Sequence, residues 1–507
     1  MTNWRTTMWI GIAMFLFLLQ ELPLFKARWV EDESWYAIPA YTLLHEGRLR
    51  NPTSADSGYS AMALKPPAMA LTLYAAFRSF GEGLVQARFP SLLAGLLLIP
   101  VVYLLGTALV GRAAGAAAAL VVSTDNFLFV AGRTARPEIY VALFGTIAFL
   151  LWAWSRRVPG FWLPLLAGLS AGVAINYHVN GIAIAVSITL LILIDCRYRF
   201  WRESRFLAFC FGAGITLIPF AVWIQSSPSN YAAFKHEYGR GSSMTIEQKI
   251  EEERWRYADF VGASSQRIPL PFHIPYRLHI AVVIVASVIL LYCRNRAFAF
   301  TGLVALAPSL LWFLYLVNKT PRYFAVVAPC LAILIGAAAF ATWQAKRFRR
   351  FAGAVVLIVV ITQLIGNAML IRKSADADYS SVATQLQRLI PRGSSAYGAI
   401  TFWFALRDRT FYSYNRIPLK DAVATLHPSY MILKDRVMMV GEGNGVDTWA
   451  ALRKDVQGFV EHHGSLIGRV SSRFYGDLEV FAVHYENLSG SRDASQQVVP
   501  NGPGLSR

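Results

Sequence analysis

Long apolar stretches separated by short basic segments are the feature that most restricts the fold of this 507-residue chain. Hydrophobic residues make up 55% of it and charged residues 15%, whereas soluble domains carry about 25% charged residues. Apolar stretches of about 17–25 residues cross a bilayer as helices, so the sequence predicts a membrane protein with about eleven spans. The predicted spans lie near 8–25, 88–110, 113–132, 139–155, 161–179, 181–195, 206–225, 278–293, 297–317, 323–343 and 352–371.

The distribution of positive charge indicates how these spans are oriented. The net charge of +18 arises mainly from short basic runs between apolar stretches, which fits the positive-inside rule better than nucleic-acid binding. The segment 66–80 decides the topology. If it crosses the membrane, every later loop changes side. If it is an interfacial helix in a first external loop, 26–87, the basic loops share the cytoplasmic side, and we expect this second arrangement. These loops lie at 112, 156–157, 197–205, 294–296 and 346–350.

The chain changes character after residue 371. Short apolar runs at 396–404, 430–433, 437–440 and 478–484 alternate with turn-forming and charged residues, and a helical pattern covers 379–390. This pattern predicts a small α/β domain. We therefore expect a membrane domain over 1–371, an external soluble α/β domain over 372–487 and a disordered tail over 488–507.

An acidic cluster of Glu31, Asp32 and Glu33 follows the first predicted span. One interpretation is a solvated turn that caps a helix over 34–46, because carboxylates favour helix N-termini. The other is a catalytic or cation-binding site at the membrane surface. The neighbouring Trp35 and Tyr36 slightly favour a site, although aromatic residues are also ordinary membrane-interface anchors. The local sequence leaves both interpretations open.

A second charged segment contains Arg133, Arg136 and Glu138 and falls on the same external face. Glu138 opens an apolar stretch near membrane depth, where ionisable groups are costly and indicate function. Alternatively, Glu138 caps the fourth predicted span and pairs with Arg133 or Arg136. Asp125, inside the third predicted span, is either a further buried acid of the site or a structural partner of Arg133.

Further residues on the external side suit a phosphate or a polar substrate. Lys65 precedes the interfacial helix and suits a phosphate, or it extends its ammonium group to the lipid headgroups. Arg322, beside Tyr323, lies in a short external loop where positive charge is unusual, so it indicates an anionic partner. His178 and Asn180 end the fifth predicted span and can hydrogen-bond a substrate, although a lone histidine there is more often structural.

Carboxylates and cations gathered at one face suit a polyprenyl-phosphate sugar. Its lipid tail needs access to the bilayer, its phosphate needs cations, and transfer of its sugar needs a base that deprotonates the acceptor. The alternative is a transporter or flippase in which Asp32 and Glu138 bind protons or cations. Against it, the acids lie at one surface rather than at the midplane, and the sequence shows no internal repeat.

Four motifs, taken in chain order, resemble the GT-C membrane glycosyltransferases, above all the lipid A aminoarabinose transferases and bacterial protein-mannosyltransferase-like enzymes. The motifs are Asp32-Glu33-x-x-Tyr36-Ala37, Lys65-Pro66, Arg133-x-x-Arg136-Pro137-Glu138 and Pro321-Arg322-Tyr323. The resemblance implies a GT-C fold in the bacterial inner membrane, with the C-terminal domain outside. It also implies an undecaprenyl- or dolichyl-phosphate sugar donor, an active site on the outer face and inversion at the anomeric carbon.

The same resemblance implies roles for single residues. Asp32 matches the presumed catalytic base and Glu33 its neighbour, while Glu138 stands where many relatives have aspartate. Cations expected at the donor phosphate are Lys65, Arg322, Arg133 and Arg136. Residues expected at the substrates are Tyr36, His178, Asn180 and Tyr323. No cofactor is required, although Asp32 and Glu138 are placed to share a divalent metal. The acceptor stays open among lipid A, lipopolysaccharide, protein and other envelope glycans.

Overall fold

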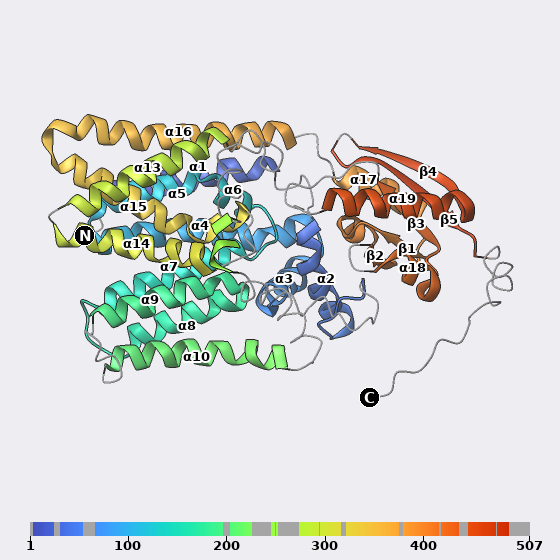
Figure 1. Ribbon diagram of the computed structural model, residues 1–507, viewed down its shortest axis with the longest axis horizontal. Helices are drawn as coiled ribbons and strands as arrows, with labels where there is room; N and C mark the ends of the chain where they lie inside the picture. Colours follow the sequence, from blue (N-terminus) through green and yellow to red (C-terminus); the bar gives the residue numbers. More distant parts are fainter. Residues whose placement is uncertain are drawn as a thin grey trace. The chain divides into compact units, whose positions relative to one another are not determined.

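The structure is a computed structural model, and the chain forms two compact units (Figure 1). The first unit comprises Met1–Asn51 and Asp56–Asp376, and the second comprises Pro52–Ala55 and Ala377–Arg507. The residues that the structure describes are 4–24, 31–53, 66–195, 203–225, 245–248, 250–251, 273–293, 295–315, 321–374, 379–414, 417–434, 445–472 and 474–485. The predicted tail, 488–507, lies outside these ranges.

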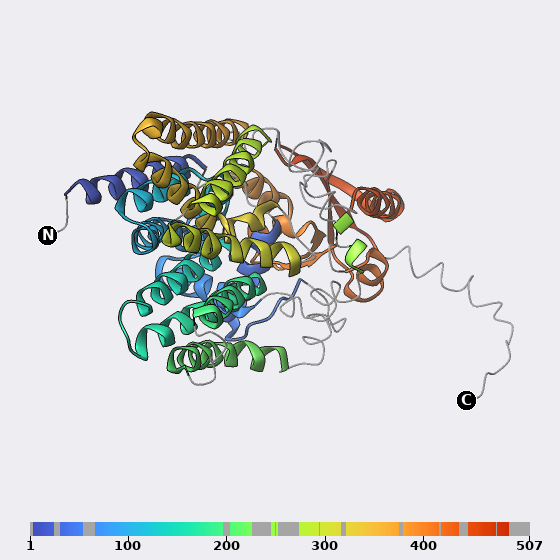
Figure 2. The same cartoon turned by 60° about the vertical axis from the view of Figure 1, so that its left-hand side comes forward.

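Apolar helices build the first unit, seen from two directions in Figures 1 and 2. The α-helices are α1 (Trp4–Glu21), α2 (Glu31–Glu46), α3 (Pro67–Phe80), α4 (Leu84–Leu109), α5 (Arg112–Thr124), α6 (Asn126–Gly132), α7 (Glu138–Ser155), α8 (Trp162–Tyr177), α9 (Ile182–Asp195), α10 (Ser204–Gln225), α13 (His273–Tyr292), α14 (Arg296–Tyr315), α15 (Ala328–Gln344) and α16 (Arg349–Ser374). Short 3-10 helices include η3 (Val179–Gly181) and η7 (Pro321–Val326).

Several of these helices have the length and composition of membrane spans. Among the described residues, four helices are long and apolar enough, with mean hydropathy from 1.5 to 2.4, and a fifth span results if α5 and α6 are counted as one bent pair. Six further apolar helices have 10–17 residues. The chain is therefore an integral membrane protein, while the full number of about eleven spans stays a prediction. Helix α3 has 14 residues, too few to cross a hydrocarbon core of about 30 Å.

The third predicted span, 113–132, is broken in the structure. Helix α5 ends at Thr124, α6 begins at Asn126, and their axes differ by 62°. Asp125 causes a defined break, because its Oδ1 accepts hydrogen bonds from the backbone N–H groups of Phe127, at 2.9 Å, and Leu128, at 3.0 Å. A carboxylate in this position is a typical N-cap that starts a new helix.

Glycines allow close packing between neighbouring helices of this unit. A side chain added at Gly168 or Gly172 of α8 would collide with α10, and one added at Gly212 of α10 would collide with the backbone of α8. The four-residue spacing puts Gly168 and Gly172 on one face of α8. Small residues on facing helices let the two backbones approach closely, as is common in membrane bundles.

A five-stranded mixed sheet with the order β2-β1-β3-β5-β4 forms the centre of the second unit. The strands are β1 (Ser395–Gly398), β2 (Thr410–Ser413), β3 (Tyr430–Lys434), β4 (Gly464–Ser472) and β5 (Gly476–Val483). The helices include α17 (Tyr379–Leu389) and α19 (Gly445–His463). β1 pairs in parallel with β2 and β3, whereas β5 pairs antiparallel with β3 and β4. Met431, Leu433, Val456 and Val460 contribute to a buried core between the sheet and α19.

This unit agrees with the predicted small α/β domain in its main features. Helix α17 and strands β3 and β5 fall where the sequence predicts them, but the apolar run 396–404 divides into β1 and a 3-10 helix, Ile400–Leu406. The run 437–440 lies outside the described residues. One segment comes from far away in the chain: the buried Thr53 accepts a hydrogen bond through its carbonyl from the N–H of Ser413, at 3.0 Å.

Candidate active site

Helix α2 carries the acidic cluster on its first turn. The helix begins at Glu31, three residues earlier than the sequence predicts, so Asp32 and Glu33 occupy its positive end. Tyr36 follows them by four and three residues, and this spacing puts all three on one side of a helix. Adjacent positions differ by about 100° around the axis, so the two carboxylates reach different neighbours.

Glu33 is buried and forms an ion pair with Arg88 of α4. The Arg88 Nε and Nη2 groups each donate to one Glu33 oxygen, both at 2.8 Å, and the N–H of Ala135 donates to Oε1, also at 2.8 Å. The side chains of Glu33 and Arg88 are 0% and 2% exposed. A bidentate arginine–carboxylate pair fixes geometry as well as charge. Glu33 therefore holds α2, α4 and the segment after α6 together.

Arg136 lies between the other two carboxylates. Its Nη1 donates to Asp32 Oδ2, its Nη2 donates to Glu138 Oε1, and its Nε donates to Glu138 Oε2, at 3.1 Å. Burial lowers the pKa of the Arg136 guanidinium, but the charges of Glu138 and Asp32 outweigh this and raise it well above its usual value. The guanidinium is therefore permanently charged, and it stabilises the charged form of both acids.

Exposure separates the three carboxylates. The side chain of Asp32 is 19% exposed, compared with 2% for Glu138 and 0% for Glu33. Glu138 is the first residue of α7 and faces Arg136, as one of the two sequence interpretations expected. Of these three acids, Asp32 is the one that a ligand reaches most easily.

Aromatic and polar residues surround this charge cluster. Burial raises the pKa of the Tyr36 hydroxyl, and the charges of Glu138 and Asp32 raise it further, so this group stays protonated at physiological pH. Tyr323 of η7 acts electrostatically on both Tyr36 and Arg136, and its ring lies 5.0 Å from the ring of His178. The Nδ1 of His178 accepts from the N–H of Asn180, at 3.2 Å. These contacts bring α2, α7, η3 and η7 to one place.

The profile of the dolichyl-phosphate-mannose-protein mannosyltransferase family matches residues 64–224. The structure is similar to ArnT from Cupriavidus metallidurans bound to undecaprenyl phosphate, with a TM-score of 0.61, 16% sequence identity and coverage of 95% of this chain and 98% of that one. The fold is that of the GT-C glycosyltransferases.

A second structure supports the GT-C fold. The oligosaccharyltransferase of Archaeoglobus fulgidus, tethered to an acceptor peptide, gives a TM-score of 0.55 and 13% identity over 85% of this chain and 69% of that one. A search of curated protein sequences gives no match. The family profile covers Arg88, Arg136 and Glu138 but begins after Asp32, so the contacts of Asp32 carry independent information.

Most of the predicted site residues meet on this GT-C scaffold, but the four cations expected at the donor phosphate make other contacts or are not fully described. Lys65 lies outside the described residues, and for Arg322 only the backbone, in η7, is described. Arg136 was expected at the donor phosphate, but its contacts are with Asp32 and Glu138, which favours a role in organising the carboxylates. Arg133 stacks on Phe129, with its guanidinium carbon 4.2 Å from the ring centre.

Two charged residues near the site were missed by the sequence analysis. Arg88, which pairs with Glu33, was taken as the first residue of a span, and its position at the start of an apolar stretch is the signal that was available. Glu21 at the end of α1 is fully buried, and the charges of Arg133 and Arg88 act on it. Asp125 was given two alternative roles, a further buried acid of the site or a structural partner of Arg133. Its carboxylate instead caps α6 and lies 3.9 Å from His279.

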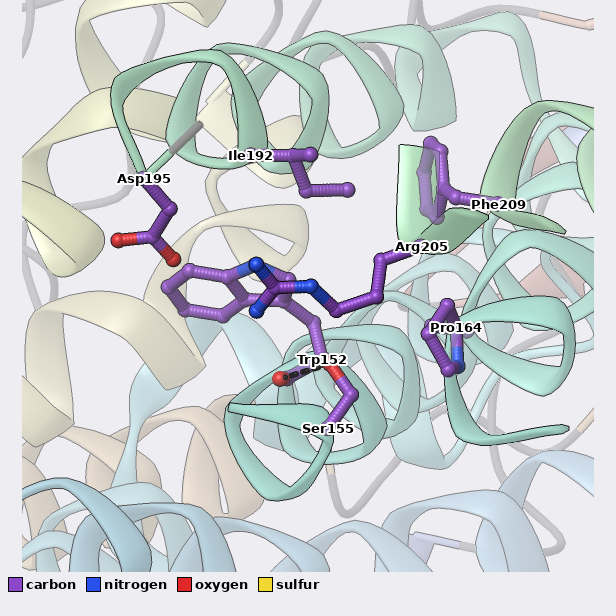
Figure 3. A pocket seen from close by; sticks show the side chains of 8 residues that line it. Trp152, Ser155, Pro164, Ile192, Asp195, Arg205 and Phe209 are labelled. Carbon is purple, nitrogen blue, oxygen red and sulfur yellow. Dashed lines mark hydrogen bonds between the residues drawn. The ribbon is translucent and has the colours of Figure 1, made fainter. Parts of the chain in front are cut away.

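The carboxylates do not form a ready metal site in the described part of the chain. No group of three His, Cys, Asp or Glu side chains that could hold a metal ion occurs there, and a guanidinium lies between Asp32 and Glu138. A pocket at the opposite end of α7 is separate from this cluster (Figure 3). Its lining includes Ser155, which lies roughly 25 Å along α7 from Glu138.

Proposed function

We propose that the protein is an inverting glycosyltransferase that moves a sugar from a polyprenyl-phosphate donor to an acceptor at the outer face of the membrane. The observation that carries this proposal is the arrangement of Asp32 and Glu138 around Arg136. Of the three buried or partly buried carboxylates Asp32, Glu33 and Glu138, Asp32 is the most exposed. The GT-C fold and the lipid-phosphate ligand of the similar ArnT structure support the donor class.

Asp32 acts as the general base in this proposal. It accepts the proton of the acceptor hydroxyl while the acceptor oxygen forms a bond to the anomeric carbon. The bond between that carbon and the phosphate oxygen breaks, and polyprenyl phosphate leaves with the electron pair. Arg136 keeps Asp32 ionised and aims it, because the guanidinium is itself held by Glu138.

The leaving phosphate needs positive charge, which we assign to Lys65 and Arg322. Phosphate is a competent leaving group, so cations suffice without an acid that donates a proton. Tyr36, Tyr323 and His178 form one wall of the sugar site. Asn180 adds a donor, because its buried Nδ2 has no hydrogen-bond partner within the described part of the chain. The sugar and the acceptor, whether lipid, protein or glycan, are left to experiment.

The test is turnover by the full-length protein in liposomes. A panel of synthetic radiolabelled undecaprenyl-phosphate sugars is supplied with envelope lipids or protein as acceptors, and acceptor-dependent release of undecaprenyl phosphate is measured. Asp32→Asn should lower kcat by about 10²–10⁴-fold, the usual contribution of a general base, and should leave binding of undecaprenyl phosphate intact.

Asp195→Asn is the matched control. Asp195 is 18% exposed and paired with an arginine, Arg156, as Asp32 is with Arg136, but it lies at the far end of the helices. It should retain wild-type turnover. Near-normal kcat in Asp32→Asn would contradict the base assignment. Movement of intact donor across the membrane without cleavage would support a transporter and contradict the proposed reaction.

A further inference from the structure

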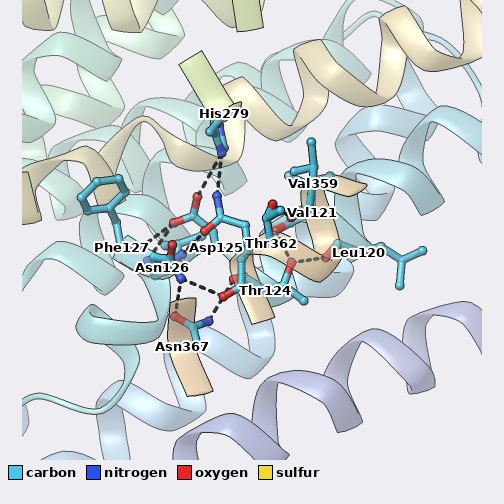
Figure 4. Close-up of polar contacts among 12 residues, drawn as sticks. Leu120, Val121, Thr124, Asp125, Asn126, Phe127, His279, Val359, Thr362 and Asn367 are labelled. Atoms are coloured by element: carbon cyan, nitrogen blue, oxygen red, sulfur yellow. Dashed lines mark hydrogen bonds and ion pairs between the residues drawn. The ribbon is translucent and has the colours of Figure 1, made fainter. Parts of the chain in front are cut away.

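A buried polar cluster lies inside the membrane unit, around the break between α5 and α6 (Figure 4). Its members come from α1, the α5–α6 break, α13 and α16, and each is at most 7% exposed. We call this group the amide cluster; it consists of Gln20, Asp125, Asn126, His279, Gln363 and Asn367. Polar groups in a bilayer interior are costly unless they are paired, so this concentration of polar side chains requires a reason.

Helix α16 supplies one side of the amide cluster. Gln363 and Asn367 are four residues apart, which places them on the same face of an otherwise apolar stretch. The Nδ2 of Asn126 donates to the carbonyl of Gln363, at 3.0 Å, and to Oδ1 of Asn367. The backbone N–H of Asn126 donates to Oε1 of Gln363, at 3.1 Å. The first residue of α6 is thus held through both its backbone and its side chain.

Asn367 also hydrogen-bonds a backbone carbonyl that has no helical partner because of the break. Its Nδ2 donates to the carbonyl of Thr124, at 3.0 Å, and to Oε1 of Gln20, at 2.7 Å. The Nε2 of Gln20 donates to the carbonyl of Ser123, at 3.1 Å. Carbonyls at the end of α5 have lost their helical partners, and side chains from α1 and α16 replace them. The angle between α5 and α6 is therefore specified by side chains.

His279 completes the contacts on the other side of the break. Its Nδ1 lies 3.0 Å from Nε2 of Gln363 and 3.9 Å from Oδ2 of Asp125. Asp125 uses its other oxygen to cap α6. Through these contacts, α13 and α16 both restrain the residue at which the chain bends.

Helix α6 transmits this restraint to the charge cluster. It has only seven residues, so it is about 10 Å long and joins the break directly to the segment 133–137. Just beyond its end, Thr134 Oγ1 donates to the carbonyl of Val130, at 2.8 Å, and the N–H of Ala135 donates to Glu33. Arg136 follows directly. A change in the direction of α6 would move Arg136 relative to Asp32 and Glu138.

We propose that Asn367 and Gln363 are positioning residues: the amide cluster sets the angle of α6 and thereby holds Arg136 between Asp32 and Glu138. The consequence for catalysis rests on the proposed glycosyltransferase function. The consequence for the loop 133–137 does not, because it concerns the protein alone. The two can therefore be tested separately.

The experiment compares full-length variants in lipid nanodiscs. Asn367→Leu removes the amide at nearly constant size, and Gln363→Met is a second variant that leaves Asn367 in place if the first does not fold. Thr362→Val is the matched control, since within the described part of the chain this α16 hydroxyl bonds only to carbonyls of its own helix, at 2.8 and 3.0 Å. Two readouts are taken: hydrogen–deuterium exchange of peptides covering 126–137, and kcat with donor KM on the undecaprenyl-phosphate sugar that the wild-type protein uses.

The expected result is faster exchange over 133–137 in both variants, with exchange of 395–434 in the second unit unchanged. kcat should fall by about 10–100-fold, since a displacement of about 1 Å costs this much, while donor KM changes less than twofold. Thr362→Val should match the wild type in both readouts. Unchanged exchange over 133–137 would overturn the proposal, and so would an increase spread over the whole chain. If the wild type transfers no sugar but the loop still loosens, the proposed function fails and the positioning role stands.

Discussion

At the scale of single residues, Asp32 and Glu33 are neighbours in sequence with different surroundings. Glu33 turns towards Arg88, which lies 55 residues further along the chain, whereas Asp32 turns towards Arg136, 104 residues away. Nothing in the local sequence distinguishes them. The difference arises because consecutive positions on a helix face different directions and the partners are fixed by tertiary packing.

Removing the guanidinium charge at the site should change the pH dependence of turnover. In Arg136→Gln, the ionised form of Asp32 loses its cationic partner and becomes less favourable. A base must be deprotonated to work, so the acidic limb of the kcat profile should move to higher pH. The measurement is kcat between about pH 4 and 9, a range that starts near the ordinary aspartate pKa of about 3.9. Arg156→Gln, at the Asp195 pair, is the control. An unmoved acidic limb in Arg136→Gln would contradict this coupling.

The Glu33–Arg88 pair should matter for stability more than for chemistry. Arg88→Met leaves a buried carboxylate without its partner and should lower the free energy of unfolding by about 3–5 kcal/mol. The double variant Glu33→Met with Arg88→Met removes both charges and should recover most of this loss. Thermal unfolding of the detergent-purified single and double variants provides the double-mutant cycle. Simple addition of the two single effects would show that the pair does not act as a unit.

At the scale of helices and strands, the hydrophobic pattern predicts where an element lies better than it predicts whether that element is continuous or broken. The stretch 113–132 is apolar apart from the polar run 123–126, so it reads as one span. Its break at Asp125 depends on Gln363 and Asn367, which follow more than 200 residues later and were not recognised as partners. The apolar run 396–404 likewise gave the location of β1 but not the turn into a 3-10 helix.

Packing between α8 and α10 should be sensitive to a single methyl group. At Gly168, an added Cβ meets the backbone carbonyl of Phe209, together with Phe209 C at 2.8 Å and Ala213 N at 2.9 Å. Backbone atoms cannot move aside cheaply, so Gly168→Ala should lower the melting temperature of the purified protein.

Gly214→Ala on α10 is the matched control for this substitution. Apart from the backbone of its own helix and its chain neighbours, no heavy atom of the described residues lies within 4 Å of the position that its Cβ would take. Alanine should therefore be neutral there or stabilise the helix by up to about 1 kcal/mol. Equal melting temperatures for the Gly168 and Gly214 variants would show that the close approach of the two helices contributes little to stability.

At the scale of the whole molecule, the order of the motifs along the chain was enough to predict the GT-C fold. The change of pattern after residue 371 was enough to predict a separate C-terminal α/β unit. Most of the charge cluster could also be predicted, because Asp32, Arg136 and Glu138 belong to short motifs with a recognisable chemistry. Arg88 and the amide cluster could not, because their partners are chosen by three-dimensional packing. The basic loops give a topology that labelling can check.

The predicted topology puts two exposed arginines, Arg48 and Arg347, on opposite sides of the membrane. In a cysteine-free background, Arg48→Cys, just after α2, should react with a membrane-impermeant maleimide added to intact cells. Arg347→Cys, between α15 and α16, should react only after the membrane is permeabilised. Both positions are exposed, so accessibility in the fold does not limit the reaction. Labelling of both positions in intact cells would contradict the positive-inside assignment.

The hydrogen bond between Thr53 and Ser413 has a consequence for biosynthesis. Thr53 leaves the ribosome early, but its partner strand is made only near the end of translation, roughly 20 to 70 s later at ordinary rates of 5–20 residues per second. The C-terminal unit therefore finishes folding only after the apolar helices have been synthesised. A fragment beginning at residue 377 lacks Thr53, so the backbone N–H of Ser413 loses its acceptor. We therefore expect such a secreted fragment to fold inefficiently unless a peptide carrying Pro52 and Thr53 is supplied in trans.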